Sequence, residues 1–384
     1  MSIEQTFSVQ YRLSDTTEKE ALQWAKQIAV EQTIEFPADL VHDEYILDHV
    51  IGKIIELRQA GRDVIARIAY EGLLIGTDLA QFMNVLFGNS SLQPGIWVEQ
   101  IEFGKGILQA FQGPKYGIEG WRKRLCRPAG AILHTAIKPM GSSVKELARM
   151  AYDFALGGAD VIKDDHGIAN QAWAPFKERV KACAEAVAEA NAKTGGHAVY
   201  SANCTADGAE TEERAYLAQE LGAGAVMAAP GLCGFGTIRR LAEAADFYLP
   251  IISHPAFLGC YIQPGVSGIS PSIVYGTLTR MAGADAVIFP SYGGRFTFTA
   301  QDCQTIAQAA RDTLGHIRPI FPSPGGGLTE HTLAGLEKIY GQDVMYLIGG
   351  GIFRHGADLA ENTAFFKGLL RTLEEKGNDR SCGS

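Results

Sequence analysis

The 384-residue sequence has few cysteines, and the seven it contains are not arranged as cysteine-dependent folds require. They are scattered along the chain, and no two of them form a C-x-x-C motif. Disulfide-stapled secreted domains and structural zinc sites both depend on paired or closely spaced cysteines. We therefore expect reduced thiols and a location in the cytoplasm.

Positive charge is also scarce, because 34 lysines and arginines face 43 aspartates and glutamates, for a formal net charge of -9. Nucleic-acid affinity depends on basic side chains that neutralise backbone phosphates, so no nucleic-acid partner is expected. No stretch stays apolar for the roughly 20 residues that a membrane span needs, and no basic region followed by an apolar run opens the chain. The sequence predicts a soluble, unexported protein without a membrane partner.

The sequence does contain a regular alternation of strand-like and helical stretches from about residue 130 onward. This alternation is typical of a parallel sheet wrapped by helices. Eight apolar runs favour an α/β fold with a C-terminal (β/α)8 TIM barrel, although an open doubly wound sheet stays an alternative because periodicity does not reveal closure. The runs are AILHTAIK (131–138), ADVIK (159–163), AVYSAN (198–203), AGAVMAA (223–229), PIISH (250–254), DAVIF (285–289), PIFPS (319–323) and VMYLIGG (344–350). Helices are expected over 143–156, 175–193, 210–221, 300–314 and 329–340.

The first 115 or so residues follow a different pattern. A strand-like opening (6–13) precedes an amphipathic helix over 18–31, a strand pair within 49–70 and a further helix over 78–87. These elements indicate a smaller α+β domain. We therefore predict an N-terminal α+β domain over 1–120 and a barrel domain over 121–384.

Polar residues and glycines gather where the predicted strands end. In (β/α)8 barrels the reacting groups lie at the C-terminal ends of the strands, so these positions predict an active site. They are Lys138, Lys163-Asp164-Asp165-His166, Asn203, His254, Ser323 with Gly325 to Gly327, and Gly349 to Gly351.

The densest group is the run from Lys163 to His166, which combines carboxylates with an imidazole as a divalent cation requires. Desolvation among like charges can depress the pKa of a lysine and open it to CO2, which gives an anionic carbamate. A solvated charged turn is the alternative for this run, and a surface salt bridge is the alternative for Lys138. Asn203 and His254, taken singly, fit structural roles equally well.

Two glycine runs, PSPGGG (322–327) and IGGG (348–351), follow the seventh and eighth predicted strands. Barrels commonly bind phosphate through backbone N–H groups of these two loops. Tight turns that need positive φ are the alternative explanation. We predict a phosphate site here.

At these residues the chain resembles the large subunit of ribulose bisphosphate carboxylase/oxygenase, and more closely its non-carboxylating RuBisCO-like relatives. The resemblance implies an N-terminal α+β domain of ferredoxin-like type, a barrel, and homodimers whose active sites join the barrel of one subunit to the N-terminal domain of the other. Higher oligomers are compatible with it. Glu31 and Asn84 match the residues that the N-terminal domain brings to the site. The resemblance is carried by FQGPKYGI (111–118), RPAGAI with AIKP (127–139), GGADVIKDDHG (157–167), RVKACAEAVAEANAKTG (179–195), YSANCT (200–205), SPGGG (323–327) and YLIGGG (346–351).

The resemblance also implies roles for individual residues. Lys163 would be the carbamylated metal ligand, Asp165 the second ligand, and His166 stands where the family has a glutamate ligand. Mg2+ is the expected metal, although an imidazole ligand admits other divalent metals. Lys138 matches a lysine that takes part in proton transfer, and His254 matches the histidine after the fifth strand.

Several departures narrow the implied chemistry. Pro255 stands where an arginine of the second phosphate site is expected, and Phe257 and Leu258 add an apolar wall there. The loop SYGGRFTF (291–298) lacks the lysine that the carboxylase uses, and has only Arg295 nearby. The other phosphate site is kept, so we expect a substrate with one phosphate and no carboxylation. The predicted substrate-binding residues are Asn84, Asn203, Ser323, Gly325, Gly326, Gly349 and Gly350; the predicted catalytic residues are Lys138, Lys163, His254 and Glu31.

The expected function is metal-dependent enolisation and isomerisation of a phosphorylated ketose such as 5-methylthioribulose 1-phosphate. Two related reactions stay open, namely decarboxylation of a 3-oxo sugar-acid phosphate of the 3-oxo-isoapionate 4-phosphate type, and enolisation of 2,3-diketo-5-methylthiopentyl 1-phosphate. A sugar-phosphate-binding protein without turnover is the alternative of another class.

Overall fold

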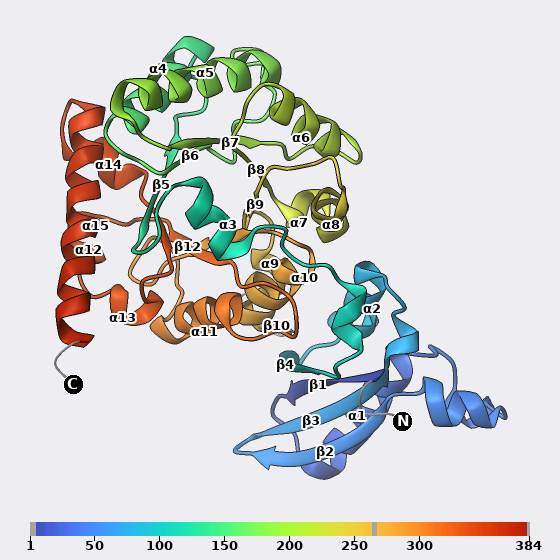
Figure 1. The fold of residues 1–384 in the computed structure, drawn as a ribbon. Coiled ribbons are helices and arrows are strands. Elements are labelled where there is room, and N and C mark those ends of the chain that lie inside the picture. The colour runs from blue at the N-terminus through green and yellow to red at the C-terminus, as the bar shows by residue number, and fades with distance from the viewer. Residues whose placement is uncertain (1–4, 263–266, 382–384) are drawn as a thin grey trace. The chain divides into compact units, whose positions relative to one another are not determined.

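The computed structural model describes residues 5–262 and 267–381, so Cys382 lies outside the described residues. The chain divides into two compact units, whose elements Figure 1 labels. The first unit comprises Met1–Gln112, Leu258–Val274 and Thr313–Ile317, and the second comprises Gly113–Phe257, Tyr275–Asp312 and Arg318–Ser384. The domain limits 1–120 and 121–384 stay a prediction. Among the described residues, no helix is long and apolar enough to cross a membrane.

A five-stranded sheet forms the first unit, in the order β10-β4-β1-β3-β2. Four of its strands pair antiparallel, and β10 (Gly268–Ile269) joins β4 in parallel from a distant part of the chain. The predicted α+β unit is therefore confirmed. Its other elements are β1 (Thr6–Leu13), α1 (Glu18–Glu31), η2 (Ala38–Leu40), η3 (Ile46–Val50), β2 (Lys53–Ala60), β3 (Asp63–Glu71), η4 (Gly72–Leu74), α2 (Leu79–Phe87), η5 (Asn89–Leu92), β4 (Ile96–Phe103), η6 (Ile107–Ala110) and the short α9 (Gly259–Ile262).

Capping side chains fix where the helices of this unit begin. The Thr17 hydroxyl accepts from the N–H of Glu20, and the Glu20 carboxylate accepts from the N–H of Thr17, so α1 starts with a capping box. Asp78 accepts from the N–H groups of Ala80 and Gln81 and caps α2. Both helices thus occupy the ranges that the sequence predicts.

Eight parallel strands close into a barrel in the second unit, in the order β5-β6-β7-β8-β9-β11-β12-β13 around the ring. The ring closes where Met345 of the last strand pairs with Ile132 of the first. The closed barrel is therefore confirmed, and the open sheet is excluded. The strands are β5 (Ile132–Ile137), β6 (Val161–Asp164), β7 (Val199–Asn203), β8 (Ala225–Ala228), β9 (Ile251–Ser253), β11 (Ala286–Pro290), β12 (Phe321–Gly325) and β13 (Met345–Leu347).

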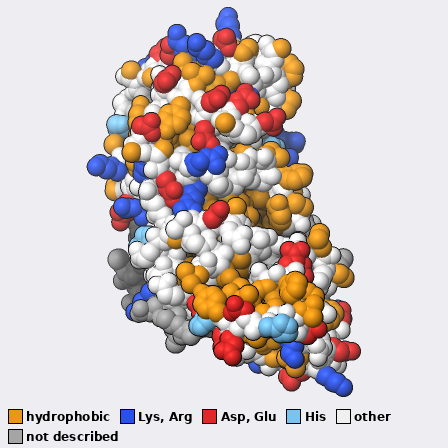
Figure 2. Space-filling model, turned by 90° about the vertical axis from the view of Figure 1, so that its right-hand side faces the viewer, with side chains coloured by type: hydrophobic (Ala, Val, Ile, Leu, Met, Phe, Trp, Pro, Cys, Tyr) orange, Lys and Arg blue, Asp and Glu red, His pale blue; other side chains and the backbone are white. Residues whose placement is uncertain are grey.

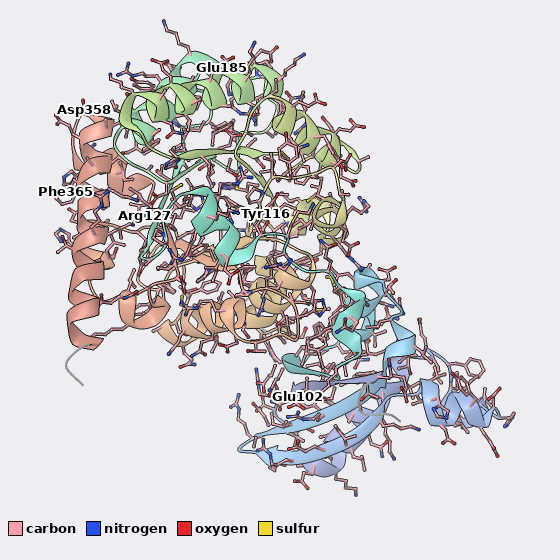
Figure 3. The ribbon with its side chains drawn as sticks, in the orientation of Figure 1. Glu102, Tyr116, Arg127, Glu185, Asp358 and Phe365 are labelled. Carbon is pink, nitrogen blue, oxygen red and sulfur yellow. The ribbon has the colours of Figure 1, made fainter. Side chains whose placement is uncertain are left out.

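Helices surround this ring, and the labelled side chains of Glu185 on α5 and Phe365 on α15 point outward from it (Figure 3). The single helix predicted over 329–340 is wrong, because Gly335 adopts a φ of 93° and divides it. The helices are α3 (Gly117–Arg124), α4 (Val144–Leu156), α5 (Phe176–Thr194), α6 (Glu210–Glu220), α7 (Pro230–Cys233), α8 (Phe235–Glu243), η7 (Ile273–Leu278, which begins in the first unit), α10 (Thr279–Met281), α11 (Ala300–Arg311), α12 (Glu330–Leu333), α13 (Glu337–Tyr340), α14 (Gly350–His355) and α15 (Leu359–Ser381).

The inside of the barrel changes from apolar to polar along the strands. At its base, Trp121 of α3 packs among apolar residues from the starts of the strands, such as Ile132 and Val161. Because side chains alternate with period two, the next inward residues are His134 on β5 and Lys163 on β6. The polar row therefore lies directly above an apolar floor, at the end of the barrel where strands finish.

Candidate active site

Lys163 points into the barrel and is 2% exposed. Its amine donates to the carbonyl of Asp164 at 2.9 Å. Burial, together with the charge of Lys138 and against the opposing charge of Asp165, lowers the pKa of Lys163 to about 8. A buried lysine with a lowered pKa is more readily neutral, and a neutral amine is the form that reacts with CO2.

Asp164 points the opposite way, as strand alternation requires. Its carboxylate accepts the Tyr200 hydroxyl at 2.6 Å and the N–H of Asn203 at 2.9 Å, and pairs with Arg179 of α5 at 3.2 Å. Both members of this ion pair are fully buried. The acidic run of the sequence therefore divides into a structural residue, Asp164, and residues that face the barrel mouth.

Asp165 lies at the centre of the group at the mouth. Its carboxylate is 3.0 Å from the amine of Lys138 and 3.2 Å from Nδ1 of His166. Burial alone would raise the pKa of this carboxyl, but the hydrogen bond from His166 and the charges of Lys163 and Lys138 outweigh burial and hold the pKa well below its usual range. Asp165 is therefore a carboxylate at any ordinary pH.

His254 adds a second imidazole to this group. Its ring is stacked on that of His166, with centroids 4.5 Å apart and planes 16° apart. Burial and the charge of Lys163 lower the pKa of His254 well below its usual value, so the ring is neutral. Its Nδ1 accepts the N–H of Ala256 at 3.2 Å, which leaves the proton on Nε2.

Lys138 connects this group with the predicted phosphate loops. The point where a Cβ of Gly349 would sit is 3.5 Å from the Lys138 amine. Gly326 and Gly327 have φ values of 92° and 116°, and an added Cβ at Gly350 would meet nothing within 4 Å among the described residues. The loop that brings Gly349 beside the lysine therefore leaves open space at its next residue, Gly350.

Two predicted substrate contacts are engaged within the chain. The Asn203 amide donates to the carbonyls of His166 and Ile168, both at 3.0 Å, and so holds the loop that carries the imidazole. The buried Ser323 hydroxyl donates to the carbonyl of Met345 at 2.9 Å. Gly325 accepts the N–H of Ser291 through its carbonyl and lies against Leu347. Contacts of these residues with a substrate stay predictions.

Glu31 and Asn84 belong to the first unit, whereas the residues described above belong to the second. The Glu31 carboxylate accepts the side-chain amide of Asn89 at 2.9 Å, and the Asn84 amide lies 3.4 Å from the Gln81 side chain. Their place in a shared active site stays a prediction.

Two polar residues inside the barrel, His134 and Ser201, are absent from the residues predicted for the site. The Ser323 hydroxyl gives its proton to a backbone carbonyl, so it accepts from Nδ1 of His134 at 3.0 Å. Within the described residues, Nε2 of His134 and the hydroxyl of Ser201 have no hydrogen-bond partner. The period-two rule applied to β5 and β7 would have placed both in the inward row with Lys163.

The apolar wall predicted beyond His254 is only partly available. Phe257 is 68% exposed and has a positive φ of 66°, whereas Leu258 is buried in the first unit. The apolar wall itself stays a prediction.

A divalent cation fits this group only if lysine takes part. Among the described residues, no set of three or more His, Cys, Asp and Glu side chains has the arrangement of a metal site. Asp165 and His166 supply two donors, and a carbamate on the buried Lys163 would supply the third and a second negative charge. The chemistry of this donor set fits a divalent metal that accepts oxygen and nitrogen ligands.

Comparison with known proteins identifies relatives of the chain. Residues 117–365 match the family described as ribulose bisphosphate carboxylase large chain, catalytic domain. The chain is 36% identical to ribulose bisphosphate carboxylase-like protein 1 of Rhodopseudomonas palustris, over 89% of this chain and 91% of that one. It is 37% identical to 5-methylthioribulose-1-phosphate isomerase of Rhodospirillum rubrum, over 94% of both chains.

Comparison with solved structures indicates the same family. The crystal structure of a Rubisco-like protein from Rhodopseudomonas palustris superposes with a TM-score of 0.85 at 33% identity, covering 96% of this chain and 98% of that one. The match thus extends over both units and includes the strand ends described above. The chain belongs to the ribulose bisphosphate carboxylase large chain family, among its RuBisCO-like proteins.

Proposed function

We propose that this protein isomerises a ketose monophosphate, 5-methylthioribulose 1-phosphate, by proton transfer and without carboxylation. The observation that carries the proposal is the position of the Lys138 amine, which lies 3.0 Å from Asp165 on one side and beside Gly349 on the other. A base in this position would stand between a polarised carbonyl and a bound phosphate. Similarity to the isomerase of Rhodospirillum rubrum over almost the whole chain supports this choice among related reactions.

The carbamate of Lys163, Asp165 and His166 would hold the metal, with Mg2+ as the first choice. A bound divalent cation would polarise the substrate carbonyl and make the neighbouring C–H bond more acidic. Other residues of the chain hold these ligands in position. Asn203 fixes the loop of His166, and the network of Asp164 with Arg179 fixes the strand end from outside.

In its neutral form the Lys138 amine would take a proton from the carbon beside the carbonyl, and the ammonium so formed would return a proton at another carbon. His254 carries its proton on Nε2 and is neutral, so it can donate a hydrogen bond to an oxygen that gains negative charge. The Lys138 side chain is 37% exposed, so its amine protons exchange with water. Deuterium from the solvent should therefore enter the substrate.

The experiment follows from this exchange. Purified protein with Mg2+ and bicarbonate would be mixed with 5-methylthioribulose 1-phosphate in D2O and followed by proton NMR. We expect loss of a carbon-bound proton signal together with a new ketose, and neither change after chelation of the metal. Release of CO2 from a 3-oxo sugar-acid phosphate, with no exchange in the ketose, would favour decarboxylation instead.

Enolisation of 2,3-diketo-5-methylthiopentyl 1-phosphate is tested with the same protein by the ultraviolet spectrum of the product. Tight binding of all three phosphates without turnover would identify a sugar-phosphate-binding protein. Formation of the enol product without isomerisation of the ketose would contradict the isomerase proposal, and so would binding without turnover.

We also propose that the protein forms homodimers, or higher oligomers of dimers, in which Glu31 and Asn84 complete the site of the partner barrel. The first unit exposes large hydrophobic side chains, and hydrophobic atoms gather on the lower part of the face in Figure 2. Extended apolar surface of this kind marks protein contacts. The exposed large hydrophobic residues of the segment 36–47 are Phe36, Leu40, Tyr45 and Leu47.

A further inference from the structure

A layer of polar side chains lies inside the barrel, directly above the apolar floor. The strands β5, β6, β7, β9 and β12 each carry a polar residue two positions after a residue of the floor, so side-chain alternation points both residues inward. On β8 and β11 the same position holds the apolar Met227 and Ile288. The members of this polar layer are all buried, and they are His134, Lys163, Ser201, His254 and Ser323.

Small side chains border Lys163 on both neighbouring strands. In the strand pairing its backbone lies beside Ala136 of β5 and Ser201 of β7. Neither strand therefore places a large side chain next to the lysine stem at this level. His134 lies within electrostatic range of the amine, because burial first and the positive charge of Lys163 second lower the pKa of His134 well below its usual value. The imidazole is therefore neutral.

One acceptor and one donor of the polar layer are left over. Nδ1 of His134 donates to the Ser323 hydroxyl at 3.0 Å, so the neutral ring carries a lone pair on Nε2. Within the described residues, neither this Nε2 nor the Ser201 hydroxyl has a hydrogen-bond partner. Buried polar groups are nearly always paired, with the protein or with an ordered water. Because β5 and β7 flank β6, the two unpaired atoms come from either side of Lys163.

We infer that Nε2 of His134 and the hydroxyl of Ser201 hold one buried water molecule beside Lys163, which makes His134 a positioning residue for the lysine. The water would donate to Nε2 and accept from the Ser201 hydroxyl and from the amine, and three partners are typical of a buried water. The Ser323 hydroxyl, which donates to the carbonyl of Met345 at 2.9 Å, would hold the imidazole from its other side. The effect on a carbamate of Lys163 rests on the proposed function, whereas the water site itself does not.

The water site is tested first in the full-length protein without metal or bicarbonate. A crystal structure of the wild type at high resolution should show an ordered water within hydrogen-bond distance of both Nε2 of His134 and the Ser201 hydroxyl. Well-ordered side chains with no water density between them would overturn the inference.

Urea unfolding of His134→Asn, Ser201→Ala and the double variant measures whether the two residues share one partner. The asparagine amide can still donate to Ser323, but it offers no acceptor at the position of Nε2. We expect the double variant to lose less stability than the sum of the two single losses, because either change alone releases the shared water. Losses that simply add would contradict a shared water.

Ser253→Ala is the matched control for this comparison. Its buried hydroxyl also lacks a partner among the described residues, but it faces outward on β9, away from the polar layer. The stability losses of Ser253→Ala and His134→Asn should therefore add in the double variant. The same coupling in this control pair would overturn the inference, because the effect would not be specific to the water site.

The positioning role is tested by loading the protein with Mg2+ and carbon-13 bicarbonate and recording the carbamate signal by NMR, which Lys163→Ala should lack. We expect His134→Asn to need about 10–100-fold more Mg2+ than the wild type for half of the full signal, as loss of an outer-shell partner costs. His134→Gln should recover part of this difference, because its amide oxygen can reach the position of Nε2. An unchanged Mg2+ requirement in His134→Asn would overturn the positioning role.

The inference and the proposed function fail separately. If the water and the coupling between His134 and Ser201 are found but the wild type gives no carbamate signal, the proposed metal site fails and the water site stands. If the carbamate signal depends on His134 but 5-methylthioribulose 1-phosphate is not converted, the isomerase proposal fails and the positioning role stands.

Discussion

At the scale of single residues, the period of a β-strand decides which polar groups meet at the barrel mouth. Lys163 and Asp165 share one parity and face inward, whereas Asp164 between them is buried against Arg179. The sequence alone marked all of them as one polar run. Burial and alternation therefore separate the two residues to which we assign the chemistry, Lys163 and Asp165, from Asp164, which supports the strand end.

Replacement of Lys163 by alanine should abolish turnover while the fold persists. The change removes the proposed carbamate ligand, so activity should fall by more than the roughly 10–100-fold that loss of an outer-shell partner costs. Activity against 5-methylthioribulose 1-phosphate and inorganic phosphate binding would be measured in parallel. Lys181→Ala, which removes an exposed lysine of α5, is the matched control. Retention of full activity in Lys163→Ala would contradict the metal site.

Asp285 should make stability depend on pH at the opposite end of the barrel. Burial raises the pKa of this carboxyl to about 6 from 3.8, although the N–H groups of Gly117, Ile251 and Tyr116 donate to it. The folded state thus holds the proton more tightly than the unfolded state. For this group, the free energy of unfolding is highest below pH 4 and falls by about 3 kcal/mol as the pH rises through 6.

Urea unfolding between pH 4 and pH 8 would measure this effect in the wild type and in Asp285→Asn. The variant lacks the titrating group. The unfolding free energy of the wild type, relative to that of Asp285→Asn, should therefore fall as the pH rises. A difference that stays constant over this range would show that Asp285 does not titrate as proposed.

At the scale of elements, the turn into α14 contains a glycine that packing requires and a glycine that we propose lies at the phosphate. An added Cβ at Gly351 would lie 2.4 Å from the carbonyl oxygen of Leu328, whereas an added Cβ at Gly350 would meet nothing within 4 Å among the described residues. Gly351→Ala should therefore lower the free energy of unfolding, by about 1–3 kcal/mol.

Gly350→Ala should leave the fold as stable as the wild type and weaken phosphate binding, because the methyl group would occupy the space left for the ligand. Thermal unfolding and phosphate titration of the two variants would be compared. Unchanged phosphate affinity in Gly350→Ala would argue against a phosphate at this loop.

At the scale of the whole molecule, the shared-site dimer predicts complementation between two inactive variants. Lys163→Ala removes the proposed metal ligand of the barrel. Glu31→Ala removes the residue that the N-terminal unit is proposed to bring to the site. Mixed dimers would contain one intact site, so random exchange of subunits should restore about a quarter of wild-type activity. Activity would be assayed after unfolding and refolding the two variants together. Absence of recovery in mixed dimers of verified composition would contradict the shared site.

Much of the fold follows from local sequence pattern. The eight apolar runs, the capping residues Thr17 and Asp78, and the polar strand ends all depend on periodicity or on neighbours within a few positions. The prediction of a single helix over 329–340 was wrong because Gly335 interrupts it with a positive φ, a backbone conformation that depends on its surroundings.

The sequence by itself determined the strands, most helices, and the residue types that a metal and a phosphate need, because these are local properties. Only the tertiary structure decided that the barrel closes, that β10 joins the first sheet, and that Arg295 meets the turn at Gly326. Each of these is a pairing between segments far apart in the chain. Periodicity carries no information about such pairings, since many partners satisfy the same pattern and packing selects one.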